Sequence, residues 1–515
     1  MQKSILKYKS QILGFLLLFF NITAIAQVPS QKEFIRDFDS LVAIIREMDP
    51  RLQSWKDLAG IDILKEIEKQ RKYVDTITST NDFMALISAT LQKCLDGHAS
   101  VVPPAVFKYM LEQLPAPEQQ HLSGMIDSMQ LQQADRNFNN LVEYQNSLSS
   151  DAPGRPFRVQ HRYINGNYVL TNTFKTEHKV FACGWKVQSL NHIDLYDSLS
   201  RILSSGSNMP KFDLKNRRFY SNNYITNKLL LNDTVYVDFR DENENIKHLT
   251  VFPDQKSSLK GIKLVSLYDN AVIKLFRKYN MLYIRLNEMV LNDQFMKKLS
   301  HFCRNKKFTL VVINISGNYG GDDAVWQKIM SMFIHDTISY EYILGFKNSA
   351  LTRKYLGIEE YQKCLKMQLW TGEEFLAKKY RETIIPSENH VSGSPKIYLI
   401  HDENIFSSAG SFRAFSNCSD QITSIGFSTG WMGGFGATPF YFILPETKTL
   451  VRLDCGIDLT NADSSAKLFQ KDEIEVSQTL EWYYNRNVAY DRNSLRRLLT
   501  FPPFIKVLQL EGFVN

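Results

Sequence analysis

The chain has 515 residues, of which 44% are hydrophobic, and its formal net charge is +7. This length and apolar fraction allow a large buried core divided over two or three domains. The positive charge is a mild excess, and basic clusters are short, such as the one at 304–307, so we find no electrostatic footprint for nucleic acid. Six cysteines show neither Cys-x-x-Cys spacing nor metal-ligand clustering, so we predict no metal site, and their pairing stays open.

Residues 1–26 have the layout of a secretory signal peptide. Three lysines precede an apolar run from Ile12 to Phe20, and Ala24-Ile25-Ala26 predicts cleavage before Gln27. The apolar run is too short for a membrane span, and no later stretch approaches the roughly 18 apolar residues that a span needs. We therefore expect a protein that is exported to the periplasm or secreted, with no membrane span after cleavage.

Residues 27–150 are predicted to form a helical cap. Apolar residues recur at helical spacing from Phe34 to Met48, and patterned segments follow at Ile61–Tyr73 and Asn81–Leu95. Asp96-Gly97 ends the last helix, because glycine stops helices, and His98 follows on a loop. A lone histidine is usually structural, but loops carry catalytic groups more often than packed helices do, which makes His98 a candidate catalytic residue.

A β-rich module is predicted over residues 155–255. The Ser, Asp, Pro and Gly residues of Ser147–Pro156 predict a linker before it. Short strand-like runs follow at Tyr163–Leu170 around an Asn165-Gly166 turn, at Trp185–Leu190, and at Thr234–Phe239 with His248–Phe252.

Residues 260–515 alternate between strand and helix patterns. The predicted strands are Met281–Leu286, Phe308–Ile315 and Ile397–Ile400, and the predicted helices are Asp293–Arg304, Asp322–Phe333 and Ser408–Ser416. Such alternation predicts an α/β layer with mostly parallel strands, whose carboxyl ends usually carry the functional site. The aromatic-rich segment His335–Ser394 holds no motif and is either an insertion over the site or scaffold.

Two of these strand ends carry candidate chemistry. The strand at Phe308–Ile315 runs into Gly317, Gly320 and Gly321, where the main chain can approach a ligand closely. Two N–H groups aimed at one point there would form an oxyanion hole, although a plain glycine-rich turn is the simpler interpretation. The strand at Ile397–Ile400 feeds through a turn into a helix that opens at Ser408, where a serine is usually an N-cap.

Three stretches together resemble the C-terminal-processing and tricorn-core family of serine proteases, the tail-specific proteases. They are Asp96-Gly97-His98, Asn314–Gly321 and Ser408-Ala409-Gly410-Ser411, in the family's order. The resemblance implies a crotonase-like or ClpP-like superhelical core in an α/β fold. Gly184–His192 is similar to the core of the PDZ-like module that this family often inserts, in a degenerate form.

The resemblance also assigns roles. Ser408 would be the nucleophile and His98 its base, and the N–H of Ala409 with that of Gly320 or Gly321 would form the oxyanion hole. Ser407 is the rival nucleophile, which the Ser-Ala-x-x register of the family disfavours. No lysine stands near Gly433, about 25 residues after the serine, so the Ser/His branch is closer than the Ser/Lys branch.

The chain departs from the family motifs at several positions. Asn314 and Ser316 stand where the family has Asp and Arg, and Ser411 stands where it has Glu. The family's late orienting acid has no clear counterpart, so Asp458 and Asp463 are the candidates, with Asp463 the tentative choice.

The sequence therefore predicts an exported serine endopeptidase without a cofactor, acting on unfolded or C-terminal peptide segments. The alternative is a catalytically weak or inactive relative that binds peptides or apolar ligands. The oligomeric state is left open.

Overall fold

The computed structural model describes residues 29–112, 114, 116–150, 159–196, 202, 210–222, 225, 234–252, 271–290, 292–304, 306–416, 419–427, 439–469, 474–483 and 495–514. The predicted signal peptide, most of the predicted linker, Cys418 and Gly433 lie outside these residues. Across the described part of the chain, no helix combines the length and hydropathy needed to cross a bilayer. The cysteines in these ranges are free thiols: Cys94, Cys183, Cys303, Cys364 and Cys455.

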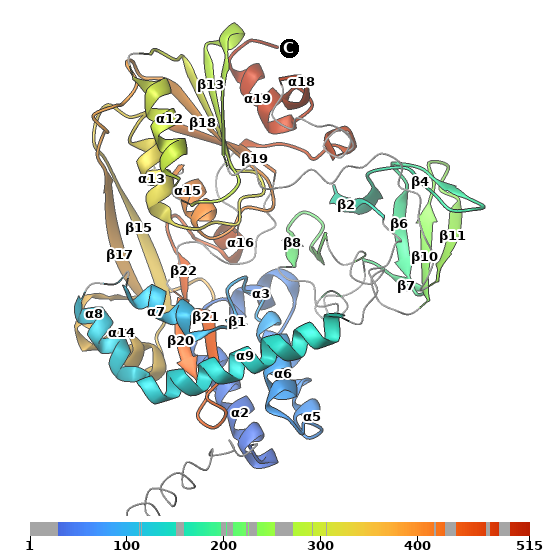
Figure 1. The fold of residues 1–515 in the computed structure, drawn as a ribbon, viewed down its shortest axis with the longest axis vertical. Helices are drawn as coiled ribbons and strands as arrows, with labels where there is room; N and C mark the ends of the chain where they lie inside the picture. Colours follow the sequence, from blue (N-terminus) through green and yellow to red (C-terminus); the bar gives the residue numbers. More distant parts are fainter. Residues whose placement is uncertain are drawn as a thin grey trace, which may run out of the picture.

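A six-stranded sheet forms the centre of the C-terminal half (Figure 1). In spatial order its strands are β12 (Ala271–Phe276), β13 (Met281–Leu286), β14 (Leu310–Asn314), β18 (Lys396–His401), β19 (Ile422–Gly426) and β23 (Ile474–Glu475). All neighbours are parallel except β12, which pairs antiparallel with β13. The predicted α/β layer with mostly parallel strands is confirmed.

Helices cover both faces of this sheet. The side of Leu282, Ile313 and Leu399 packs against α12 (Asp293–Cys303), α13 (Asp323–Met330) and α15 (Ser408–Ser416). The side of Tyr283 and Val312 packs against α18 (Leu495–Leu498) and α19 (Pro502–Leu510). Every residue of β13 and β14 is buried, because strands covered on both faces are apolar throughout. The helix α15 begins and ends at the predicted residues.

The N-terminal region is helical, as predicted. Its elements are α2 (Gln31–Met48), α3 (Leu52–Ala59), α4 (Ile63–Glu68), α5 (Arg71–Val74), α6 (Thr80–Gln92), α7 (Pro104–Glu112), α8 (Ala116–Met125) and α9 (Ser128–Ser150). The predicted apolar stripe of α2 is buried from Phe34 to Met48. The predicted segment Ile61–Tyr73 divides into the two short helices α4 and α5.

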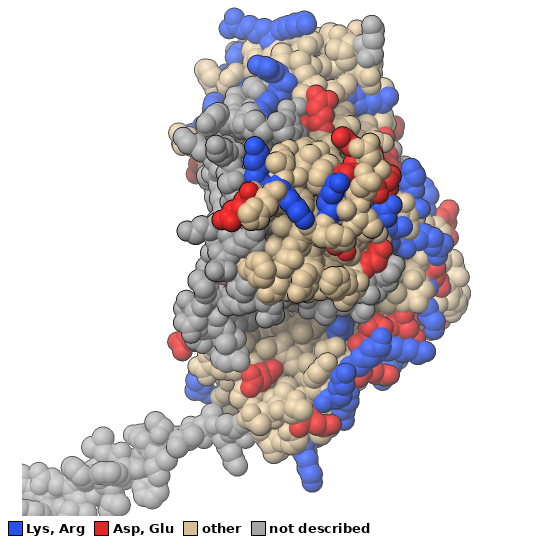
Figure 2. Space-filling model, turned by 90° about the vertical axis from the view of Figure 1, so that its right-hand side faces the viewer, with Lys and Arg blue, Asp and Glu red and all other residues tan. Residues whose placement is uncertain are grey.

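A separate antiparallel sheet follows the helices, in the order β11-β10-β6-β3-β2 with β7 on β6. Its strands are β2 (His161–Ile164), β3 (Asn167–Leu170), β6 (Lys186–Leu190), β7 (Ile193–Asp194), β10 (Val235–Arg240) and β11 (Ile246–Val251). The predicted Asn165-Gly166 turn joins β2 to β3, and both residues have the positive φ that this tight hairpin requires. The outer face mixes acidic and basic side chains (Figure 2), including the pairs of Glu244 with Lys186 and Arg240.

Smaller strand pairs lie beside these sheets. They are β4 (Phe174–Lys175) with β5 (Val180–Phe181), and β8 (Lys211–Asp213) with β9 (Arg218–Tyr220). The β8–β9 hairpin packs on α3, where Phe212 and Phe219 flank the buried Trp55 ring.

The segment His335–Ser394 is scaffold. It forms β15 (Ile338–Lys347), α14 (Ala350–Lys363), β16 (Leu365–Gln368) and β17 (Glu374–Ile384), and β15 also pairs with β22 (Gly456–Asp458). Its buried side chains, among them Leu344 and Phe375, join the same apolar core as the N-terminal helices. The segment therefore ties the helical cap to the C-terminal half.

A three-stranded sheet completes that connection and leads to the site. It consists of β1 (Ser100–Val101), β21 (Leu450–Asp454) and β20 (Pro439–Ile443). In it, β1 pairs antiparallel with β21, Ser100 opposite Arg452 and Val101 opposite Val451.

Candidate active site

The β1–β21 register places His98 beside Asp454. Extended by two residues, the pairing of Ser100 with Arg452 sets His98 opposite Asp454. The imidazole Nδ1 of His98 lies 2.7 Å from Oδ2 of Asp454. Because a carboxylate accepts, Nδ1 donates, and in the neutral imidazole this tautomer leaves the lone pair on Nε2. Asp454 is fully buried, and the His98 side chain is 13% exposed.

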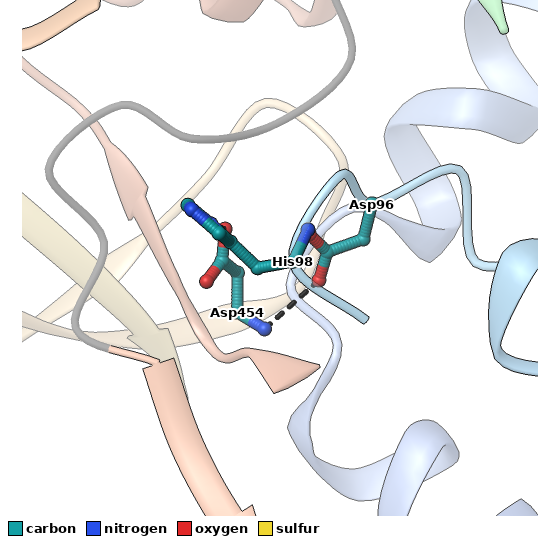
Figure 3. A group of neighbouring side chains, drawn as sticks. All are labelled: Asp96, His98 and Asp454. Atoms are coloured by element: carbon teal, nitrogen blue, oxygen red, sulfur yellow. Dashed lines mark hydrogen bonds and ion pairs between the residues drawn. The ribbon is translucent and has the colours of Figure 1, made fainter. Parts of the chain in front are cut away.

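A buried ion cluster surrounds this pair, and Figure 3 shows one of its members, Asp96, beside His98 and Asp454. Oδ1 of Asp96 accepts from the backbone N–H of His98 at 2.8 Å, and its Oδ2 accepts from the backbone N–H of Asp454 at 2.8 Å. Nη2 of Arg51 donates to Oδ2 of Asp96 at 2.9 Å and to the carbonyl of Asp454 at 3.1 Å. Arg51 also donates through Nε to Asp49 at 3.0 Å. All four charged residues around His98 are buried.

The charges in this cluster shift the carboxyl groups in opposite directions. Burial acts to raise the pKa of Asp96, but the adjacent Arg51 guanidinium prevails and lowers it to about 2. Burial raises the pKa of Asp454, and the Asp96 charge adds to that rise. Asp96 is therefore ionised at neutral pH, whereas burial opposes the charge of Asp454, which His98 and Arg51 stabilise.

The donor set does not suit a metal ion, although ligand atoms of Asp96, His98 and Asp454 lie within 4.8 Å of one another. Both oxygens of Asp96 already accept N–H groups, and Nδ1 of His98 is directed at Asp454. Arg51 supplies the positive charge that a cation would bring. The arrangement fits instead the histidine–carboxylate pair of a hydrolase, in which the acid holds the imidazole orientation.

A strained turn leads from β18 into α15. Ser407 has a φ of +53°, in the left-handed region that a non-glycine residue rarely adopts, and it is half-buried. The next residue, Ser408, is the first of the helix. A serine on a strained strand-to-helix turn presents its Oγ above the sheet, and the N–H of the following residue points to the same space.

The hydroxyl of Ser408 faces the protein interior. The residue is 4% exposed and its Oγ is closed to solvent. The hydroxyl lies near the Asp323 carboxyl at the start of α13, without a hydrogen bond of standard geometry to it. Because a nucleophile must reach its substrate, this position does not support the role predicted for Ser408.

The glycine loop after β14 packs directly on the serine turn. A Cβ on Gly320, whose φ is +100°, would lie 2.6 Å from Cβ of Ser407 and 2.7 Å from the carbonyl oxygen of Phe406. Such contacts are closer than real Cβ atoms make, so only glycine fits. The loop is further bound to the turn by the N–H of Phe406, which donates to the carbonyl of Asn318 at 3.0 Å.

The predicted oxyanion donors differ in their availability. The N–H of Gly320 donates to Oδ1 of Asn318 at 2.8 Å, and the N–H of Ala409 donates to the carbonyl of Phe406 at 3.1 Å. Within the described residues, the N–H groups of Gly321 and Ser408 make no hydrogen bond. These two are therefore the donors that remain for an oxyanion.

Asn314 and Asp402 support the glycine loop after β14 and the turn after β18 through hydrogen bonds. Asn314 accepts from the N–H of Ser316 at 2.9 Å and donates to the Tyr283 hydroxyl at 2.9 Å. Oδ1 of Asp402 accepts from the N–H groups of Gly317 at 2.8 Å and of Asn404 at 2.9 Å. The substitutions at 314 and 316 thus leave the turn supported.

The histidine loop and the serine turn meet at Phe406. The rings of His98 and Phe406 are 4.5 Å apart, centroid to centroid, and a Cβ on Gly97 would lie 2.4 Å from the Phe406 ring. Ser407 follows Phe406 by one step of about 3.8 Å between Cα atoms. The structure therefore brings the histidine loop and the glycine loop into contact with the same Phe406–Ser407 turn, from three segments far apart in the sequence.

The tentative assignment of Asp463 as the orienting acid is wrong, because the carboxylate that contacts His98 is that of Asp454. Asp463 is exposed and accepts from the Ser464 hydroxyl, and Asp458 accepts from the N–H of Thr460. Sequence reasoning missed Asp454 because the contact rests on strand pairing across more than 350 residues. The available signal was an apolar strand pattern that ends in an acid.

The chain is similar to known proteins in fold but not in sequence. No protein-family model matches the chain, and no curated protein matches it in sequence. Among solved structures, mature CPAF in complex with lactacystin is similar with a TM-score of 0.52 at 11% identity, over 94% of this chain and 99% of that one. The chain has the fold of CPAF.

Two further solved structures match with lower scores. The photosystem II D1 C-terminal processing protease has a TM-score of 0.35 at 11% identity, over 86% of this chain and 92% of that one. The tricorn protease has a TM-score of 0.29 at 14% identity, over 82% of this chain and 32% of that one. Both of these structures carry the name of a protease.

Proposed function

We propose that the chain is a serine peptidase in which Ser407 is the nucleophile, His98 the general base and Asp454 the orienting acid. The observation that carries this proposal is the hydrogen-bonded His98–Asp454 pair, where the His98 ring packs on Phe406, the residue before a serine on a strained strand-to-helix turn. The similarity of the fold to that of CPAF supports the same class of reaction.

The reaction would begin with proton transfer from the Ser407 hydroxyl to Nε2 of His98 as the oxygen attacks the peptide carbonyl. Asp454 holds the imidazole through Nδ1 and stabilises the imidazolium that forms. The N–H groups of Ser408 and Gly321 would receive the negative oxygen of the tetrahedral intermediate. His98 then returns the proton to the leaving amine, and water releases the acyl group by the same route.

Ser407 replaces the Ser408 of the sequence-based prediction on three grounds. Its backbone has the strained conformation of a nucleophile turn, its side chain is only half-buried, and the following N–H is available as a donor. Ser408 fails on accessibility, since its Oγ is closed to solvent.

The proposal extends to an exported enzyme with a peptide or protein substrate. Residues 1–26 support export, and the motif order supports cleavage of unfolded or C-terminal peptide segments. The strand-rich region would serve as the family's PDZ-like module, and the six-stranded sheet with its helices as its crotonase-like core. No cofactor takes part in the proposed steps.

Fluorophosphonate labelling of the purified protein lacking residues 1–26 tests the proposal. We expect wild type to react and Ser407→Ala and His98→Ala to lose labelling, while Ser408→Ala and the control Ser411→Ala keep it. Loss in Ser408→Ala with retention in Ser407→Ala would restore the sequence-based assignment. A folded wild type that does not react would contradict the peptidase and favour a binding protein.

A further inference from the structure

The Asp96 carboxylate holds two catalytic partners at once. Its two oxygens accept from the backbone N–H groups of His98 and Asp454, each at 2.8 Å. These two N–H groups belong to segments that are also joined by the pairing of β1 with β21. The N–H of Val102 donates to the carbonyl of Leu450 at 3.0 Å, and Nε of Arg452 donates to the carbonyl of His98 at 3.0 Å. Beyond Ser100, the carboxylate takes the place of the ladder hydrogen bonds that would continue between the segments.

Arg51 forms a buried ion pair with this carboxylate. Arg51 is 2% exposed, lies at the start of α3, and donates to Asp96, to Asp49 and to the carbonyl of Asp454. A buried carboxylate without a cationic partner would be costly and would take up a proton. The fixed guanidinium therefore keeps Asp96 ionised, so that both of its oxygens remain acceptors.

We propose that Asp96 and Arg51 are positioning residues for the reaction. The proposal rests on the proposed function, and it assigns to them the placement of the imidazole relative to Asp454 and Ser407. Misplacement of a catalytic group by about 1 Å can cost roughly 10²-fold in rate. Neither side chain needs to touch the substrate for this effect, since each acts through the His98 and Asp454 backbone.

Asp96→Asn is the sharpest perturbation. The side chain keeps its shape, but one acceptor oxygen becomes an NH2 group that faces a backbone N–H donor, so one of the two anchors is lost. Arg51→Lys is the second variant: it keeps the charge but cannot reproduce the fork of hydrogen bonds. Asp57→Asn is the matched control, because Asp57 is an exposed carboxylate on the same helix α3.

Three measurements apply to each variant: kcat and KM on fluorescently labelled casein, the rate of fluorophosphonate labelling, and the low-field proton resonance of the His98 Nδ1–H. For Asp96→Asn we expect kcat and the labelling rate to fall at least tenfold, KM to stay within threefold, and the resonance to broaden or vanish. For Arg51→Lys we expect a three- to tenfold fall in kcat with the same constancy of KM. The control should stay within twofold of wild type.

A folded Asp96→Asn variant with an unchanged resonance and a labelling rate within threefold of wild type would overturn the proposal. Should that variant not fold, Arg51→Lys decides by the same criteria. An equal loss of activity in Asp57→Asn would also overturn it, since the loss would then follow from removing any carboxylate in this region. If wild type neither cleaves nor labels, the proposed function fails, and the proton resonance still reports whether Asp96 fixes the His98–Asp454 pair.

Discussion

Replacement of Asp454 by asparagine removes the one charge that directly faces the proposed base. Oδ2 of Asp454 lies 2.7 Å from Nδ1 of His98, and the residue is fully buried. Asparagine occupies the same volume, so the β1–β21 pairing and the Asp96 contact to the backbone should persist. The perturbation is therefore confined to the imidazole and its charge.

The magnitude follows from the distance. Two unit charges about 4 Å apart interact by roughly 4 kcal/mol at an effective dielectric constant of about 20. Loss of this stabilisation in the transition state, where His98 carries a proton, corresponds to about 10³-fold in rate. If the amide NH2 turns toward Nδ1, the imidazole adopts the wrong tautomer, and the loss approaches the roughly 10⁴-fold seen for this substitution in a Ser-His-Asp protease.

The assay is the second-order rate of fluorophosphonate labelling, together with thermal unfolding to establish that the variant is folded. We expect a fall of 10³- to 10⁴-fold in Asp454→Asn and wild-type labelling in the control Asp463→Asn, which alters the exposed acid of the sequence-based prediction. A folded Asp454→Asn variant that labels within tenfold of wild type would show that Asp454 does not orient His98.

Three further predictions concern other parts of the structure. Gly320→Ala should lower labelling at least 10²-fold, because the methyl group would collide with the Ser407 turn; wild-type labelling would contradict this close approach. Asp37→Ala should lower the free energy of unfolding in urea by about 2–5 kcal/mol, since two backbone N–H groups at Glu446 and Thr447 lose their acceptor; a loss under 1 kcal/mol would count against that contact. Burial lowers the pKa of His161 from 6.5 to about 3. As the pH falls below about 6.5, the unfolded chain therefore binds a proton at His161 that the folded protein does not bind, and the free energy of unfolding decreases. Between pH 6 and 5 the wild type should lose about 1 kcal/mol more than His161→Phe in urea titrations, and equal losses would exclude the effect.

The elements of the α/β core could be predicted because their apolar patterns are local. The run at Leu310–Asn314 is buried throughout, and a strand covered by helices on both faces has no alternation to obscure its length. The helix at Ser408–Ser416 follows the buried strand β18 after a short turn, so its start could be predicted from the sequence. The bounds of helices are harder to predict: the apolar pattern of Ile61–Tyr73 is continuous, but the segment forms two short helices.

The site could be predicted only in part, because its decisive features are not local. His98 was recognisable from the helix-stopping glycine before it, but its partner Asp454 depends on a strand pairing between distant segments. The choice between Ser407 and Ser408 depends on one backbone dihedral angle and on which side chain faces α13. The four-residue motif Ser408–Ser411 indicates neither the backbone dihedral angle of Ser407 nor the direction of the Ser408 side chain.

The most direct test of the account is to identify the modified residue in fluorophosphonate-labelled wild type by tandem mass spectrometry of the peptide that spans Ser407 and Ser408. We expect an adduct on Ser407, which is abolished in His98→Ala. An adduct on Ser408, or one on Ser407 that persists without His98, would contradict it.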